Sequence, residues 1–101
     1  MSIFPFSMHI VRGHSMQPSI KDGSRVVAFV WAYLFSRPKV GDIVVFRGND
    51  NKEYVKRVVV ANKNEFVVEG DNKEDSKKLL PISKDMILGK VVLHYLLPSI
   101  P

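Results

Sequence analysis

The sequence predicts a mostly β protein, built as a small antiparallel coiled or barrel-like sheet with little helix. Val and Ile are frequent, and the apolar runs are short and separated by turn residues. A chain of 101 residues is long enough to bury one modest core but not two. We therefore expect a single domain that covers residues 1–101.

Six segments have the length and composition of strands, and Gly, Pro, Asn or Asp lies in the breaks between them. These segments are Met8–Val11, Arg25–Tyr33, Asp42–Arg47, Glu53–Ala61, Glu65–Glu69 and Leu88–Tyr95. The breaks Gly48–Asn51 and Asn62–Asn64 are typical of hairpin loops, which indicates an antiparallel meander. Only Ser15–Ile20 and Pro81–Met86 are expected to form a helical turn or two.

Composition limits the partners of the chain. Its 15 Lys and Arg against 10 Asp and Glu give a formal charge of +5, which favours an anionic partner such as phospholipid or nucleic acid, or simply aids solubility. The absence of cysteine excludes disulfides and thiolate metal sites. The strongest apolar run, Val26–Phe35, is shorter than the roughly 20 residues of a membrane helix. Met1–Ile10 lacks the pattern of a secretory signal. We expect a soluble or peripheral protein.

Lys56 is the unusual residue of the segment Glu53–Ala61. The two-residue period of a strand places it on one face with apolar neighbours, Tyr54, Val58 and Val60. The opposite face carries Glu53 and Arg57 and is expected to meet solvent. Burial of Lys56 would lower its pKa and suit it to act as a base. Alternatively, its stem packs on the sheet and its amine reaches water.

Ser15 lies in a second unusual segment, Gly13-His14-Ser15-Met16-Gln17-Pro18. Gly13 allows a close approach of the backbone, and Pro18 restricts the chain just after the serine. Most serines in such a setting are turn or cap residues. A nucleophilic serine needs a base within hydrogen-bonding range and a donor for the oxyanion.

The three histidines are poor candidates for that base. His14 adjoins Ser15, and adjacent side chains on an extended chain point apart. His9 and His94 have no sequence context that indicates a catalytic triad or a metal site. We interpret all three as structural or surface residues and expect no metal or organic cofactor.

Five segments in order resemble the type I signal peptidase family, whose serine peptidases use a Ser-Lys dyad. The resemblance covers nearly the whole chain. The matching segments are the serine box at Met8–Val27, the Gly-Asp strand opening at Pro38–Phe46, the lysine box at Tyr54–Val60, the Gly-Asp-Asn box at Val68–Ser76 and the final strand at Ile87–Val91.

The resemblance implies a role for each matching residue. Ser15 would be the nucleophile, and uncharged Lys56 would be the general base of an acyl-enzyme mechanism. Ser76 would hold the lysine amine, and Gly70 would leave room beside it. Asp71 and Asn72 would shape the loop. The Ser15 N–H would be one oxyanion donor.

Other implied features concern the substrate and the surroundings of the site. Precursor proteins would bind as an extended strand added to a sheet edge, with small side chains near the cleavage point. Met16 and Pro18 are candidates for the substrate groove. The enzyme would be membrane-associated with an extracytoplasmic active site, or soluble if it matures a single precursor.

The chain also departs from the family pattern. Gly13 stands where some members have a hydroxyl that helps to form the oxyanion hole, so any second oxyanion donor must come from elsewhere. The backbones of Ser15 and Gly13 are the oxyanion candidates that we name. After Ser76 the chain continues Lys77-Lys78, where the family often has an Asp and an Arg. No membrane anchor and no inserted β-domain are seen, so the resemblance is to a minimal catalytic core.

Three alternatives remain open. One is a maturation protease for a single precursor, like the relatives that remove the leader of nickel superoxide dismutase. Another is a non-catalytic basic β-module that binds nucleic acid or a membrane through aromatic residues, with Phe29, Trp31, Tyr33 and Phe35 on one strand face. We expect most of that row to be core and expect no nucleic-acid partner. The last is a catalytically inactive relative.

Overall fold

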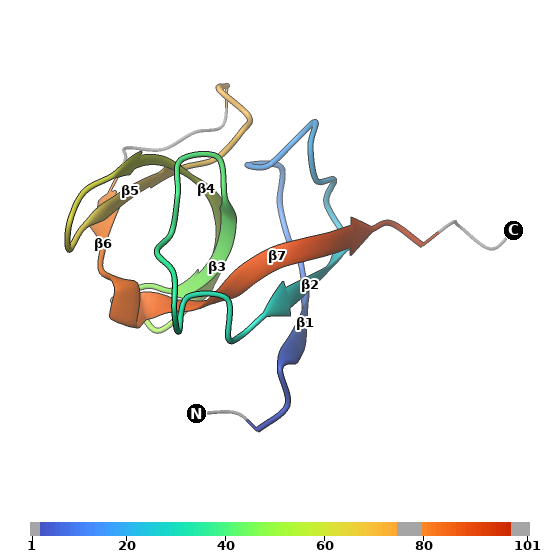
Figure 1. The fold of residues 1–101 in the computed structure, drawn as a ribbon. Coiled ribbons are helices and arrows are strands. Elements are labelled where there is room, and N and C mark those ends of the chain that lie inside the picture. The colour runs from blue at the N-terminus through green and yellow to red at the C-terminus, as the bar shows by residue number, and fades with distance from the viewer. Residues whose placement is uncertain (1–2, 75–79, 98–101) are drawn as a thin grey trace, which may run out of the picture.

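A computed structural model describes residues 3–74 and 80–97 as a seven-stranded antiparallel sheet (Figure 1). The strand order is β1-β2-β7-β3-β4-β5-β6. The strands are β1 (Phe6–Ile10), β2 (Arg25–Phe29), β3 (Ile43–Arg47), β4 (Glu53–Ala61), β5 (Phe66–Glu69), β6 (Leu80–Ile82) and β7 (Ile87–Tyr95). One short 3₁₀ helix, η1 (Lys84–Met86), precedes β7. The predicted fold class, a small antiparallel β protein with little helix, is confirmed.

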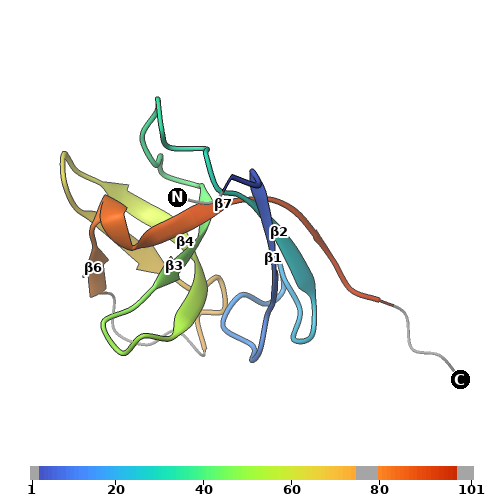
Figure 2. The same ribbon diagram turned by 90° about the horizontal axis from the view of Figure 1, so that it is seen from below.

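The long strand β7 joins two parts of the sheet. Its first residues pair with β3, with Val45 opposite Gly89, and its later residues pair with β2, with Val27 opposite Leu93. The strands β3 to β6 curl round beside the start of β7, while β1 and β2 lie along its second half (Figures 1 and 2). The sheet is therefore strongly coiled, and its two ends carry different parts of the site described below.

Two clusters of buried side chains form the core. Successive residues of β3 point to opposite faces, so Val44 and Phe46 enter one cluster and Val45 enters the other. The first cluster consists of Tyr33, Val44, Phe46, Val58, Phe66, Val68 and Ile82. The second consists of Val11, Met16, Ile20, Val26, Ala28 and Val45. The second cluster lies beneath the segment that carries Ser15.

Most predicted strands and both hairpin loops are confirmed within a few residues. The predicted turns between Ser15 and Ile20 form, with the Ile20 N–H donating to the Met16 carbonyl at 2.9 Å. The segment Pro81–Met86 is only partly helical, because its first residues pair with β5 as the strand β6. The strand β6 has three residues, which are too few to show a two-residue period in the sequence.

The predicted strand Arg25–Tyr33 is too long. The chain leaves the sheet after Phe29 and turns, with the Leu34 N–H donating to the Trp31 carbonyl at 3.2 Å. Because of this turn the aromatic residues do not share one strand face. Tyr33 is buried with 8% exposure, whereas Phe35 is 99% exposed.

The second face of β4 is not the solvent face that the sequence predicted. Val55 packs against the second cluster, and Arg57 is held in an ion pair with Asp71. Both faces of this strand are therefore covered along part of their length. The prediction failed because Glu53 and Arg57 find partners from distant segments.

Among the described residues, no helix is long and apolar enough to cross a membrane.

The contrast between Tyr33 and Phe35 gives a test of the fold. The Tyr33 hydroxyl donates to Asp42 Oδ2 at 2.7 Å. Tyr33→Phe should lower the free energy of unfolding by about 2 kcal/mol, because a hydrogen bond to a carboxylate is lost. Phe35→Ser should change it by less than about 0.5 kcal/mol, since the ring is exposed. Urea denaturation would measure both; equal effects would contradict the burial of Tyr33.

Candidate active site

Ser15 lies in a turn that is anchored on both sides. The Val11 N–H donates to the Ser24 carbonyl at 2.8 Å, and the Gly13 N–H donates to Asp22 Oδ1 at 2.8 Å. Gly13 has a φ of +98°, a conformation that residues with a side chain rarely adopt. Met16, which follows the serine, is completely buried in the second cluster. These contacts fix a half-buried Ser15 above the core.

The loop after β5 packs directly on this turn. A Cβ added to Gly70 would lie 2.5 Å from the Ser15 carbonyl oxygen and 3.1 Å from its Cβ, so only glycine fits. The Asn72 N–H donates to the Ser15 carbonyl at 2.8 Å, and Asn72 Nδ2 donates to the His14 carbonyl at 2.9 Å. Residues about 55 positions apart thereby fix the serine backbone. We call this contact the seam between Gly70–Asn72 and His14–Ser15.

An ion pair ties the same loop to β4. Arg57 Nε donates to Asp71 Oδ1 at 2.9 Å and Arg57 Nη2 donates to Asp71 Oδ2 at 2.8 Å, while Arg57 Nη1 reaches the Gly41 carbonyl at 2.8 Å. The hydrogen bonds from Arg57, helped by the Ser19 side chain, lower the pKa of Asp71 despite its burial. Since Arg57 follows Lys56 in β4, this bidentate pair holds the loop beside the lysine.

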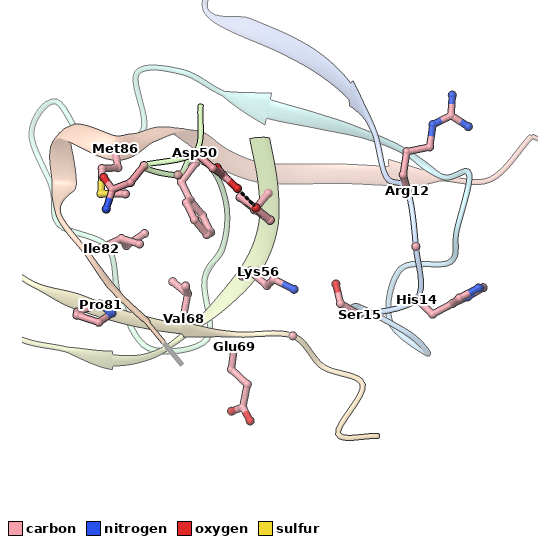
Figure 3. Close-up of a pocket in the computed structure, with 16 residues that line it drawn as sticks. Arg12, His14, Ser15, Asp50, Lys56, Val68, Glu69, Pro81, Ile82 and Met86 are labelled. Carbon is pink, nitrogen blue, oxygen red and sulfur yellow. Dashed lines mark hydrogen bonds between the residues drawn. The ribbon is translucent and has the colours of Figure 1, made fainter. Parts of the chain in front are cut away.

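Lys56 and Ser15 line one cavity of about 620 Å³. In Figure 3 the Lys56 side chain extends from β4 toward the Ser15 side chain, which points back at it. The other residues that line this cavity are Arg12, Gly13, His14, Phe46, Gly48, Asn49, Asp50, Tyr54, Val68, Glu69, Gly70, Pro81, Ile82 and Met86. The half-buried lysine therefore shares its face of β4 with Tyr54 and Val58, as the two-residue period predicted.

A smaller cavity of about 130 Å³ adjoins the same two side chains. Two extended segments border it: Ile10–Arg12, which leads from β1 to Ser15, and Glu53–Lys56 at the start of β4. The described pairs between β4 and β5 begin at Arg57, so Glu53–Lys56 face no described strand on that edge. We call this cavity the groove.

The remaining predicted site residues are placed differently. Met16 is in the core and Pro18 is exposed, and neither lines the two cavities. The N–H of Gly13 is engaged by Asp22, so this residue shapes the turn. Ser76 lies outside the described residues.

Two of the histidines have hydrogen-bond partners other than Ser15. His14 points away from Lys56 in Figure 3 and forms a 2.9 Å hydrogen bond with Gln17. His9 forms hydrogen bonds with Ser7 and Glu53. Within residues 3–74 and 80–97, no group of three or more His, Asp or Glu side chains could hold a metal ion.

Two contacts at the site are not predicted by the sequence pattern. The two-residue period places Arg57 on the solvent face, although the opposite charge of Asp71 in the Gly-Asp-Asn segment is a signal for the pair. The contact of His9 with Glu53 joins residues 44 positions apart, and no local pattern indicates it.

Comparison with known proteins identifies the family to which this chain belongs. The sequence model of the family described as signal peptidase, peptidase S26, matches residues 1–62. The chain therefore belongs to this family, which confirms the resemblance. It is 27% identical over 106 residues to signal peptidase I of Bacillus caldolyticus, covering 99% of the chain and 58% of that protein. It is 34% identical over 82 residues to signal peptidase IB of Staphylococcus aureus, covering 75% and 43%. The chain thus spans about half the length of these relatives.

The seam gives one prediction. Gly70→Ala should lower the free energy of unfolding by about 1–3 kcal/mol, because the new Cβ overlaps the Ser15 backbone. Gly48→Ala is the matched control, since the atoms nearest to its Cβ would belong to the side chains of Asp50 and Tyr54 and not to the backbone. Thermal melts compare the two; a stable Gly70→Ala protein would contradict the close approach.

The ion pair gives a prediction that depends on pH. The pKa of Asp71 is lowered below 3.8 in the folded protein, so its contribution to stability is present above that pH and lost as the pH falls through the folded value. Asp71→Asn should therefore cost about 2 kcal/mol at pH 7. The difference from wild type should shrink below pH 3.8. Urea denaturation of the wild type and the Asp71→Asn variant, at pH 7 and below pH 3.8, measures both differences in unfolding free energy. A difference that does not change with pH would refute the prediction.

Proposed function

We propose that this chain is a serine endopeptidase in which Ser15 is the nucleophile and Lys56 the general base, and that it removes leader peptides from precursor proteins. The main support is that the two side chains, from segments 41 positions apart, point toward one another across one cavity (Figure 3). Membership of the signal peptidase family supports the same reaction class.

The reaction follows from the chemistry of the two groups. Neutral Lys56 Nζ takes the proton of Ser15 Oγ as the oxygen attacks the scissile carbonyl carbon. The tetrahedral intermediate expels the amine of the mature protein, which receives that proton from Lys56. The leader stays on Ser15 as an ester. Lys56 then takes a proton from a water molecule, whose oxygen attacks the ester carbon. The bond from that carbon to Ser15 Oγ breaks, Ser15 Oγ regains its proton from Lys56, and the leader leaves with a free carboxylate.

The seam prepares the serine for this attack. Gly70 and Asn72 hold the Ser15 backbone, so little reorientation is needed when the substrate binds. The Ser15 N–H is the oxyanion donor that we propose. Gly13 contributes by shaping the turn, since its own N–H already donates to Asp22.

The groove suits a peptide in extended form. β1 lies at one end of the strand order and pairs with β2, while Glu53–Lys56 pair only with β3 among the described strands. A peptide placed between these two edges could hydrogen-bond to both, as in strand addition. Its backbone would then pass both Ser15 and Lys56.

A membrane surface is the second partner that we propose. Phe6, Met8 and Ile10 alternate along β1 with their side chains exposed, and Phe35 is also exposed. The net charge of +5 would favour anionic headgroups beside such apolar side chains. This arrangement would bring the groove close to precursors held in the membrane.

Substitution of either catalytic residue tests the proposal. Ser15→Ala and Lys56→Ala should each reduce cleavage of a precursor with a small-X-small leader site by at least about 10³-fold. Lys56→Arg should be equally inactive, because a guanidinium keeps its proton at the working pH. Lys63→Ala, an exposed lysine in the β4–β5 loop, serves as control. Full activity of any catalytic variant would exclude the dyad.

The pH dependence of cleavage tests the role of Lys56 separately. A lysine base works only when it is deprotonated, so kcat/KM should rise with pH through the neutral and mildly alkaline range. A profile that is flat over this range would show that another group takes the proton.

A further inference from the structure

A chain of polar side chains leads from β1 to Glu53, which lines the groove. Ser7 Oγ lies 2.8 Å from His9 Nε2, and His9 Nδ1 lies 2.8 Å from Glu53 Oε1. Arg47 Nη2 donates to the second carboxylate oxygen, Glu53 Oε2, at 3.0 Å. The His9 side chain is only 15% exposed and that of Glu53 is 40% exposed. We call the contact of His9 with Glu53 the bridge.

The bridge joins two strands that are not paired with each other. β1 and β4 are separated in the sheet by β2, β7 and β3, and the successive antiparallel pairs give them the same direction. Both lead to the site, because Ser15 follows β1 and Lys56 lies in β4. The five strands surround the second core cluster, and the groove opens between β1 and β4.

The inner wall of the groove changes character along its length. Val11 and Val55 pack with the second cluster near Ser15. His9 lies two residues before Val11, which directly follows β1, and Glu53 lies two residues before Val55 in β4. Residues two apart on an extended backbone point to the same side, so His9 and Glu53 point to the inner side, where Glu53 lines the groove. Moving away from Ser15, the inner wall thus passes from two valines to a histidine and a glutamate.

Every second side chain of an extended peptide in the groove faces this inner wall. If the side chain beside the scissile carbonyl points inward to Val11 and Val55, the side chain two residues earlier also points inward. That second side chain meets the bridge. Burial works to raise the pKa of Glu53, but the hydrogen bonds from His9 and Arg47 outweigh it and hold this pKa below its ordinary value. The peptide side chain therefore meets a carboxylate.

We propose that His9 and Glu53 form a polar subsite that selects a leader residue with a small hydrogen-bonding side chain, two positions before the residue that supplies the scissile carbonyl. This inference rests on the proposed peptidase function and adds a specificity to it. A hydroxyl group can donate to the Glu53 carboxylate, which has lone pairs beyond its bonds to His9 and Arg47. An aliphatic side chain there covers the carboxylate without replacing the water that it displaces.

Threonine and valine have almost the same shape, so they separate hydrogen bonding from size. We would measure kcat/KM for two fluorogenic peptides that carry Thr-Gln-Ala or Val-Gln-Ala before the cleavage point. Wild-type protein should prefer the Thr peptide about fivefold, as expected for one hydrogen bond. His9→Leu combined with Glu53→Leu should reduce the ratio to one or reverse it, because the wall becomes apolar.

Two further variants keep the result interpretable. Glu53→Gln keeps an amide that can accept from His9 and bond to threonine, so it should retain a preference for Thr. His94→Leu, an exposed histidine of β7 away from the groove, should leave the wild-type ratio unchanged. Circular dichroism melts of each variant would establish that it is folded.

Each result has one meaning. Equal cleavage of the two peptides by wild type, or a Thr preference that survives in the folded double variant, would overturn the polar subsite and leave the peptidase intact. If the wild-type protein cleaves neither peptide and also fails to cut a small-X-small precursor under the same conditions, the proposed function is wrong. This inference would then be wrong with it.

Discussion

The contact between Gly70 and the Ser15 backbone is the constraint on which the arrangement of the site depends. Ser15 follows β1 at one end of the sheet, whereas Gly70 follows β5 near the other end. These ends meet only because the sheet coils and because position 70 has no side chain. Asn72 reinforces the contact with hydrogen bonds to two consecutive carbonyls. Arg57 and Asp71 then fix the loop to the strand that carries Lys56.

The same coiling leaves an opening in the sheet. β1 and Glu53–Lys56 of β4 approach each other with parallel directions, and no described strand lies in the sheet between their facing edges. An extended peptide would complete this arrangement, and its backbone would pass the two proposed catalytic groups. The groove and the site therefore have one cause. In our account, catalysis and substrate specificity both depend on the distance between β1 and β4.

The sequence was informative where local pattern decides the structure. The two-residue period of β4 placed Lys56 on the face of Val58, and the asparagine-rich loops marked both hairpins. It was less informative where distant residues compete with local preference. The aromatic run after Phe29 has strong β propensity, yet the chain turns so that Tyr33 can bond Asp42. Arg57 and His9 looked like surface residues because their partners lie 14 and 44 positions away.

For the site, the matching segments predict Ser15, Lys56 and Gly70 as candidate residues, and the structure brings these three together. They could not show that Met16 supports the turn from below, since a buried methionine and one that lines a groove have the same local sequence. A crystal structure with a peptide aldehyde ending in alanine would test the central claim most directly. We predict a bond from Ser15 Oγ to the aldehyde carbon, Lys56 Nζ within hydrogen-bonding range of Ser15 Oγ, and the peptide paired between β1 and β4. A peptide bound elsewhere, or a Lys56 amine turned away from the adduct, would contradict it.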